Sequence, residues 1–275
     1  MKFYHIIIIL MTSFSSCKKQ ERHKPIETKQ EKIATDLKLD HFNIWTNYPQ
    51  KAKQKLIELG FTAIPDSLSR IHHGQGTTGR YFYFLNTYLE FIYVYDKEEF
   101  TLNNKKNTAL DFKERVNFEN NGASPFSIAL KVKDYKVDKI PFEKIEYHQE
   151  WMAENMSIYA AKNSKLNLKE PSVFVVYPEI ETDEFETYDD LVKIPEEYKI
   201  WRTFFKHPNG AKKVTKITIT SSGLNDNTAT IKTLNTLQNI SVKSGEKHLM
   251  EVYFDNKAQG KKFDLRPEIP LIIYL

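Results

Sequence analysis

The chain of 275 residues contains a single cysteine, Cys17, which lies close to the N-terminus. No disulfide can form within the chain, so an apolar core has to hold the fold together. Hydrophobic residues make up 40% of the sequence and charged residues 28%, which is ordinary for a globular protein. A chain of this length can bury a sizeable core in one large domain or two smaller ones.

The charge pattern argues against nucleic acid as a partner. Forty Lys and Arg face 36 Asp and Glu, which leaves a net charge of only +4. The lysines are also scattered, so no basic stripe follows a phosphate backbone. Aromatic residues reach 13%, and rings of this kind favour a β-rich fold.

The first 17 residues have the pattern of an export signal. Lys2 precedes an apolar run, residues 6–11, that weakens toward Phe14 and is shorter than the roughly 20 residues needed to span a bilayer. The segment Phe14-Ser15-Ser16-Cys17 resembles a bacterial lipobox, with Phe14 where Leu is usual. In that signal the cysteine is lipidated and becomes the mature N-terminus. The alternative is a plain signal peptide with an incidental cysteine.

Residues 18–36 are charged and nearly free of large apolar side chains, which predicts a disordered tether. Acyl chains on Cys17 would hold the protein to a membrane. Lys18 and Lys19 follow the cysteine without the early Asp that typically retains such proteins at the inner membrane. By this resemblance we expect an exported lipoprotein in the outer membrane of a Gram-negative bacterium.

The first folded unit is predicted as a βαβββ module. Its strands alternate with period two, and its helix carries an apolar stripe and ends at Gly60. The expected elements are a strand at 39–45, a helix at 50–59 and strands at 61–64, 80–85 and 87–95.

Two later regions are predicted as further copies of this unit. The second is degenerate, with a strand at 126–132, a short helix at 134–140 and strands at 144–151, 157–162 and 172–177. The third has a strand at 214–220, a helix at 226–238 and strands at 248–254, 261–265 and 270–274. Repeats that cannot close a core alone must pair with a neighbour. We therefore divide the chain into two modules at 37–180, an acidic linker or excursion at 181–206 and a C-terminal module at 207–275.

Several stretches resemble glyoxalase-like domains of the vicinal oxygen chelate superfamily, which also includes bleomycin resistance proteins and dioxygenases. They are "LDHFNIW", "LIELGFT", "GQGTTGRYFYF", "TYLEFIYV" and "HPNGAKKVTKITIT". The resemblance covers residues 38–275 and is carried mainly by 38–95. It implies an α+β fold of repeated βαβββ modules that form cupped mixed sheets, with helices on the outer face. It also implies a small-molecule ligand in the concave side.

Many members of this superfamily bind a divalent metal such as Zn, Fe, Mn or Ni through His and Glu on the first and last strands of a module. The matching positions are His41 and Glu90. Alternation places Asp40, Phe42 and Ile44 on one face of the first strand, so His41 should point into the cup. Glu90 lies among apolar neighbours, where an unpaired acid is costly to bury.

The sequence is compatible with more than one role for His41 and Glu90. A catalytic metal usually takes three protein ligands. The second copy offers only Ser127 or Ile128 on its first strand and Val175 or Val176 on its last, and the third copy offers Lys216, none of which is a good ligand. One of four further histidines could complete a site: His72, His73, His148 or His207. Alternatively, His41 and Glu90 act as acid and base, or form a hydrogen-bonded pair that lines an organic-ligand pocket.

Five other residues are predicted to line the pocket. Gln75 and Arg80 belong to a glycine-rich stretch that lacks the Gly-Lys-Ser/Thr ending of a phosphate loop, so we interpret it as a hairpin at the pocket rim. His207 begins a His-Pro-Asn-Gly turn. The full set of candidates is Asn43, Gln75, Arg80, Tyr88 and His207.

Three classes of function remain from the sequence. The first is an enzyme of the lyase, isomerase or dioxygenase kind, the second a non-catalytic small-molecule binder, and the third a lipoprotein whose fold serves protein contact. Nucleophilic hydrolysis has little support, because there is no Gly-x-Ser-x-Gly elbow and the sole cysteine lies at the predicted anchor. Fold alone does not choose among the three classes.

Overall fold

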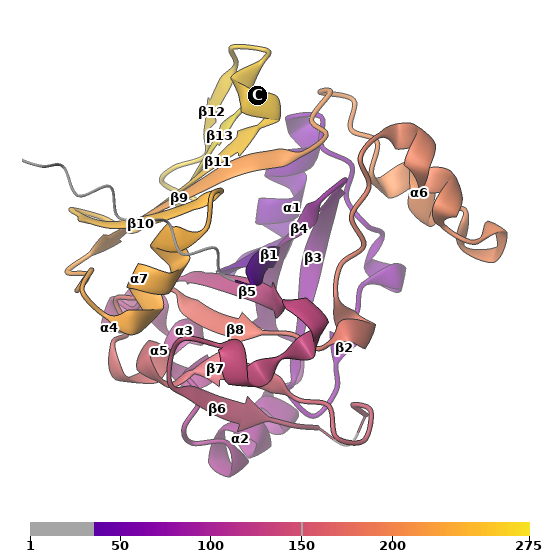
Figure 1. Ribbon diagram of the computed structural model, residues 1–275. Coiled ribbons are helices and arrows are strands. Elements are labelled where there is room, and N and C mark those ends of the chain that lie inside the picture. Colours follow the sequence, from indigo (N-terminus) through magenta and orange to yellow (C-terminus); the bar gives the residue numbers. More distant parts are fainter. Residues whose placement is uncertain (1–35, 150) are drawn as a thin grey trace, which may run out of the picture. The chain divides into compact units, whose positions relative to one another are not determined.

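The computed structural model describes residues 36–149 and 151–275, and its strands form two sheets (Figure 1). The predicted export signal, the lipidation of Cys17 and all but the last residue of the tether lie outside these residues. Within the described ranges, no helix has both the length and the apolar character needed to cross a bilayer.

The larger sheet has eight strands in the order β2-β3-β4-β1-β5-β8-β7-β6. Their bounds are β1 Leu37–Trp45, β2 Ile71–His72, β3 Thr77–Phe84, β4 Thr87–Val94, β5 Phe126–Val132, β6 Lys144–Tyr147, β7 Ile158–Ala161 and β8 Ser172–Val175. The sheet consists of two halves with one strand order, in which the first strand pairs parallel with the last. The halves meet where β1 and β5 pair antiparallel.

This arrangement confirms the predicted α+β class with curled mixed sheets. In the first half, helix α1 (Pro49–Glu58) connects β1 to the later strands. In the second half, two single 3-10 turns at Lys133–Tyr135 and Val137–Lys139 replace the helix predicted at 134–140. The strand predicted at 61–64 is irregular chain, because Phe61 bonds back to the helix end at Leu56 instead of joining a ladder.

The smaller sheet has five strands in the order β10-β9-β11-β13-β12. The bounds are β9 Val214–Ser222, helix α7 Ala229–Thr236, β10 Ile240–Gly245, β11 Leu249–Phe254, β12 Lys262–Asp264 and β13 Leu271–Tyr274. The prediction of a third βαβββ copy is wrong. Helix α7 leads into an unpredicted strand, β10, that pairs parallel with β9, and β11 occupies the other side of β9.

One apolar core joins the two sheets. Phe42 and Ile44 on β1 belong to the same buried cluster as Leu56 on α1 and as Ile219 and Phe254 on the smaller sheet. Because side chains alternate along a strand, this packing takes one face of the larger sheet. The opposite face is left to line a cavity.

Short helices fill the connections between the strands. They are α2 Lys97–Lys106, α3 Phe112–Val116, α4 Phe118–Asn121, α5 Lys162–Leu166 and α6 Trp201–Phe204. The acidic segment 181–206 is folded, with 3-10 turns at Tyr188–Lys193 and Glu196–Tyr198 before α6. It packs against Leu85 through Phe185, Leu191 and Phe205. In Figure 1 the part that carries α6 extends to the right of the sheets.

Candidate functional site

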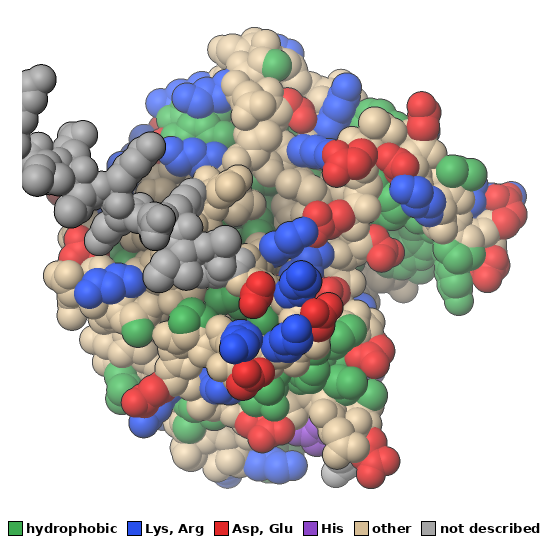
Figure 2. Space-filling view, in the orientation of Figure 1, with side chains coloured by type: hydrophobic (Ala, Val, Ile, Leu, Met, Phe, Trp, Pro, Cys, Tyr) green, Lys and Arg blue, Asp and Glu red, His purple; other side chains and the backbone are tan. Residues whose placement is uncertain are grey.

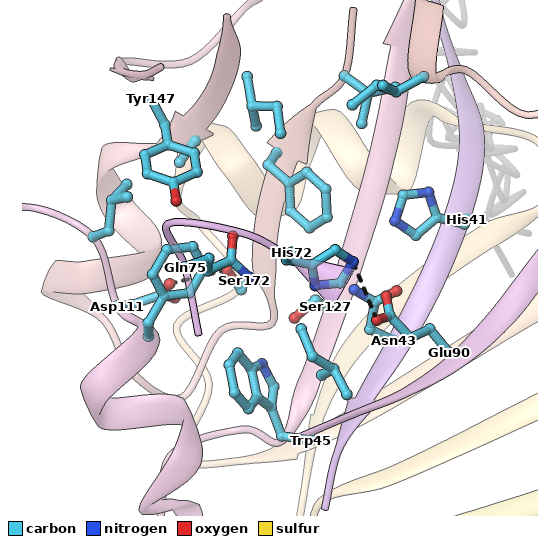
Figure 3. A pocket seen from close by; sticks show the side chains of 18 of the residues that line it. His41, Asn43, Trp45, His72, Gln75, Glu90, Asp111, Ser127, Tyr147 and Ser172 are labelled. Atoms are coloured by element: carbon cyan, nitrogen blue, oxygen red, sulfur yellow. Dashed lines mark hydrogen bonds and ion pairs between the residues drawn. The ribbon is translucent and has the colours of Figure 1, made fainter. Parts of the chain in front are cut away.

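A cavity of about 100 Å³ opens on the face of the larger sheet that α1 does not cover. A single water needs about 10–15 Å³ of such space, so the cavity has room for several water-sized groups. Both halves of the sheet contribute to its wall. Figure 3 shows inward-pointing side chains from four of the strands, among them His41, Asn43 and Trp45 of β1, Glu90 of β4, Ser127 of β5 and Ser172 of β8.

Asn43 and Glu90 lie opposite each other in the parallel pair of β1 and β4. Both are almost fully buried, with 4% and 2% of their surface exposed. Within the described parts of the chain, Oδ1 of Asn43 and Oε1 of Glu90 have no hydrogen-bond partner. A buried polar atom without a partner costs about 1–3 kcal/mol. The cavity therefore presents two acceptors that a ligand can satisfy.

The pKa of Glu90 is raised toward neutral pH. Burial raises the pKa of Glu90 to about 7, against the opposing effects of the nearby Tyr81 hydroxyl and the charge of Arg70. The nearest histidine is His72, whose Nε2 lies 3.7 Å from Oε1 of Glu90. Burial, reinforced by Arg70, lowers the pKa of His72 to about 3. At neutral pH His72 is uncharged, so this contact is not an ion pair.

His41 points into the cavity, but its partners differ from those expected. Its Nδ1 donates a hydrogen bond to Oδ1 of Asp40 at 2.5 Å. Its ring stacks on Tyr88, with centroids 4.2 Å apart. The described residues contain no hydrogen bond or ion pair between His41 and Glu90, so the predicted hydrogen-bonded pair is not formed.

The partnership of His41 with Asp40 depends on a bulge in β1. The register between β1 and β5 shifts between Leu39 and His41, which takes Asp40 out of simple alternation. The prediction that Asp40 shares a face with Phe42 and Ile44 is therefore wrong. Its buried carboxylate accepts bonds from the backbone N–H of Thr182 at 2.7 Å and from the Thr182 hydroxyl at 3.1 Å.

The electrostatics of Asp40 follow from these contacts. Burial acts to raise its pKa, but the hydrogen bond and charge of His41, the Thr182 amide and Lys131 together outweigh burial. The pKa of Asp40 consequently lies below its ordinary value, and Asp40 is a charged, fully engaged group at neutral pH. It orients His41 and is not available to a ligand.

The five predicted pocket residues divide into two groups. Asn43, Gln75 and Tyr88 line the cavity. Arg80 does not, because it lies opposite Phe91 in the hairpin of β3 and β4 and so faces away. Its guanidinium lies 3.3 Å from Asp66 and over the ring of Tyr93.

His207 has a structural role away from the cavity. Its Nδ1 accepts a bond from the N–H of Thr62, and its Nε2 donates to the carbonyl of Tyr83, both at 2.9 Å. Its ring packs against Phe61 and Phe84. Burial lowers the pKa of His207 to about 4, which keeps it neutral.

Several polar residues that line the cavity were not singled out from the sequence, among them Arg70, Asp111, Tyr147 and Ser172. Tyr81, the neighbour of Glu90, was not singled out either. Tyr81 lies directly opposite Glu90 across the hairpin. The two-residue turn at Leu85-Asn86 fixes that register, so the pairing of Tyr81 with Glu90 was readable from the sequence. Arg70 precedes β2 after an irregular stretch, and no local pattern places it at the cavity.

A divalent metal is implied by the superfamily but does not fit the donors present. The described residues contain no group of three or more His, Cys, Asp and Glu side chains able to hold a metal. The second half of the sheet offers the cavity Ser127 and Phe174 at the matching strands, and His41 already uses Nδ1 on Asp40. A catalytic metal normally takes three protein ligands. The described cavity wall therefore lacks the donor set of a catalytic metal site.

Comparison with known proteins supports the predicted resemblance. Residues 39–164 match the family model of the glyoxalase-like domain, which supports the vicinal oxygen chelate superfamily. A solved structure of a hypothetical protein from Staphylococcus aureus is similar at 12% sequence identity and a TM-score of 0.45. That similarity covers 86% of this chain and 97% of the other. The search of curated proteins gave no match.

Proposed function

We propose that the protein binds a small oxygen-bearing organic molecule in the cavity and that Glu90 exchanges a proton with it. The observation that carries the proposal is the pair of buried oxygens, Oδ1 of Asn43 and Oε1 of Glu90, that face the cavity without a partner among the described residues. Buried polar groups in native proteins are normally satisfied. A ligand with a hydroxyl group next to a C–H group would satisfy both, because the hydroxyl donates its hydrogen to Oδ1 of Asn43 and accepts one from Glu90 when Glu90 is protonated.

The chemistry we propose is proton transfer without a metal. A general acid or base is most effective when its pKa lies near the working pH, and that of Glu90 is about 7. In the ionised form, Oε1 removes a proton from the carbon next to a carbonyl. In the protonated form, Glu90 returns that proton to the resulting enolate at the neighbouring carbon or on the opposite face. The product is an isomer of the substrate, so the reaction is the isomerisation of a small hydroxy carbonyl compound.

A non-catalytic binder is the second candidate. The observation that favours it is the state of His41, the obvious second acid–base group, which is held by Asp40 and stacked on Tyr88. Glu90 would then act alone in proton transfer. A cavity with one such group can serve to sequester a molecule without turning it over.

The test uses the purified full-length protein with hydroxyacetone in deuterated water, followed by proton NMR. The proposal expects exchange of the substrate's carbon-bound protons, and Glu90→Gln should slow this exchange by about 100-fold or more. Glu58→Gln, at an exposed position of α1, is the matched control and should not change the rate. Saturation transfer without exchange would favour the binder. Absence of both signals would overturn the proposal.

We also propose that the protein is an exported lipoprotein anchored through Cys17, in the outer membrane of a Gram-negative bacterium. The support is the apolar run that ends at Phe14-Ser15-Ser16-Cys17 and the charged stretch after it. Metabolic labelling with an alkyne fatty acid in a Gram-negative host should mark the wild type and not Cys17→Ser. The variant should also leave the outer-membrane fraction, and labelling of both proteins would contradict the proposal.

A further inference from the structure

An outer groove adjoins the cavity. It has a volume of about 480 Å³ and is bounded by the folded segment 181–206 and by β3 and β4. Three residues, Arg70, Tyr88 and Ile180, line both the groove and the cavity, so the two spaces meet there. In Figure 2 the surface is hollowed below the lobe that carries α6.

The groove has an aromatic wall. Tyr83 lies between two rings of the segment, with centroids 6.0 Å from Trp201 and 5.7 Å from Phe205. Tyr83 also stacks on Tyr88, whose ring continues into the cavity beside His41. Tyr83 and Trp201 are partly exposed, so their faces are accessible from the groove. Such a wall suits a flat apolar group.

Arg70 is the cation at the junction, and in the described part of the chain it forms no salt bridge, although its charge acts on Glu90. Its guanidinium has no hydrogen-bond acceptor there and no carboxylate within 4.0 Å. The other two basic residues nearby are engaged, since Lys131 lies 2.7 Å from Glu184 and Lys193 lies 2.7 Å from Asp190. A guanidinium free to form two parallel bonds matches the geometry of a carboxylate.

The acids of the groove restrict where a ligand can carry negative charge. Glu181 and Asp183 line the groove, and neither forms a salt bridge within the described residues. They would repel an anionic group placed in the groove itself. The junction at Arg70 is thus the favourable place for a negative charge, and the part of the ligand that lies in the groove should be uncharged.

We infer that the ligand is a 2-hydroxy carboxylate with an aromatic side chain. Its C2 hydroxyl lies against Asn43 and Glu90, its carboxylate binds Arg70, and its ring lies in the groove against Tyr83 and Trp201. This inference names the substrate class of the proposed site and rests on that proposed function. It requires that the cavity and the groove are occupied by one molecule.

Calorimetry on the full-length protein tests the inference with three matched probes. They are 3-phenyllactate, lactate, which lacks the ring, and 3-phenyllactamide, which lacks the charge. We expect phenyllactate to bind at least tenfold more tightly than either of the others. Equal affinity for phenyllactate and phenyllactamide, or for phenyllactate and lactate, would overturn the inference.

Variants separate the two contacts. Arg70→Gln should weaken phenyllactate binding at least tenfold and leave phenyllactamide binding unchanged, whereas Trp201→Ala should weaken phenyllactate binding and leave lactate binding unchanged. Lys199→Gln, an exposed cation in the same segment, is the control and should bind as the wild type does. If Glu90-dependent proton exchange with hydroxyacetone is observed but Arg70→Gln binds phenyllactate normally, the substrate class is wrong and the proposed function stands.

Discussion

Asn43 and Glu90 occupy the same register position of the parallel strands β1 and β4, and each leaves one buried oxygen without a hydrogen-bond partner among the described residues. Two such atoms side by side destabilise a protein that has no ligand. Their retention at the wall of a cavity is what a binding site requires, since groups needed for function often reduce stability.

Replacing Asn43 by Leu should therefore stabilise the protein and abolish binding of a polar ligand. We expect the free energy of unfolding in urea to rise by about 1 kcal/mol, because an apolar side chain of similar size removes the unsatisfied acceptor. Asn103→Leu is the matched control at another buried asparagine. It should lower the stability, since Oδ1 of Asn103 accepts bonds from Asn107, Tyr147 and Gln149. Loss of stability in both variants would contradict this explanation.

Glu90 should make the stability depend on pH in a direction opposite to that of most carboxylates. Its pKa is raised from 4.5 to about 7 in the folded protein, so between these values the folded state holds a proton that the unfolded state has lost. Stability then falls as pH rises through this window. A change in pKa of this size corresponds to about 3 kcal/mol.

Urea unfolding of the wild type and of Glu90→Gln at pH 5 and pH 8 measures this effect, because all other titrating groups are common to both proteins. The difference in free energy of unfolding, wild type minus variant, should decrease by about 3 kcal/mol from pH 5 to pH 8. A difference that does not change with pH would show that the carboxyl group titrates normally.

Local sequence patterns were sufficient to orient the part of the cavity wall that β1 and β4 form. Alternation along β1 and β4 directs His41, Asn43, Tyr88 and Glu90 into one cavity, because period two is a property of each strand alone. The strand order of the first half follows from the same signals together with the helix that ends before Gly60.

The remaining features depend on contacts distant in the sequence. The bulge directs the Asp40 carboxylate toward the backbone N–H of Thr182, which is 142 residues away. No pattern within residues 39–45 predicts this bulge. Arg70 reaches the cavity through an irregular loop, and loops carry no periodic signal. In the smaller sheet, β10 contributes only Ile240 and Val242 as buried residues, which is too short an alternation to distinguish from a loop.

Asp40 should hold the segment 181–206 against the sheet. Asp40→Ala removes the acceptor of both Thr182 bonds and leaves His41 buried beside no carboxylate, so we expect a loss of about 3 kcal/mol in the free energy of unfolding. Hydrogen exchange followed by mass spectrometry should show faster exchange at Thr182 and along the segment. Asp183→Ala, an exposed neighbour, should leave the exchange unchanged.

Asp40 should make the stability depend on pH with a sign opposite to that of Glu90. Because the pKa of Asp40 is lowered in the folded state, its stabilising effect is present above the ordinary value of 3.8 and is lost as pH falls through the folded pKa. Exchange along 181–206 should accelerate in acid in the wild type. The acceleration should be smaller in Asp40→Ala after correction for the intrinsic exchange rate, with only the titration of other groups such as Glu181 and Asp190 left to contribute.

Arg115 should be the charged side chain whose loss is most costly to the fold. It is fully buried, its Nε donates to Oδ2 of Asp111 at 2.7 Å, and its two terminal nitrogens donate to the carbonyls of Ser124, Ser164, Leu168 and Glu170 at 2.7–2.9 Å. Arg115→Met would leave the buried Asp111 carboxyl without its ion-pair partner, together with four carbonyls lacking this donor. We expect a loss of about 3–5 kcal/mol in urea unfolding.

A lysine cannot replace this arginine, because a single ammonium does not provide the planar array of donors that reaches Asp111 and the four carbonyls at once. Arg115→Lys should therefore recover only a minor part of the stability lost in Arg115→Met. Lys113→Met, an exposed change on the same helix, should stay within about 0.5 kcal/mol of the wild type.

Since Asp111 also accepts a bond from Ser172 at 3.1 Å and both line the cavity, Arg115→Lys should weaken ligand binding as well. Wild-type stability in Arg115→Lys would mean that charge alone, without the directed hydrogen bonds, accounts for the role of this residue.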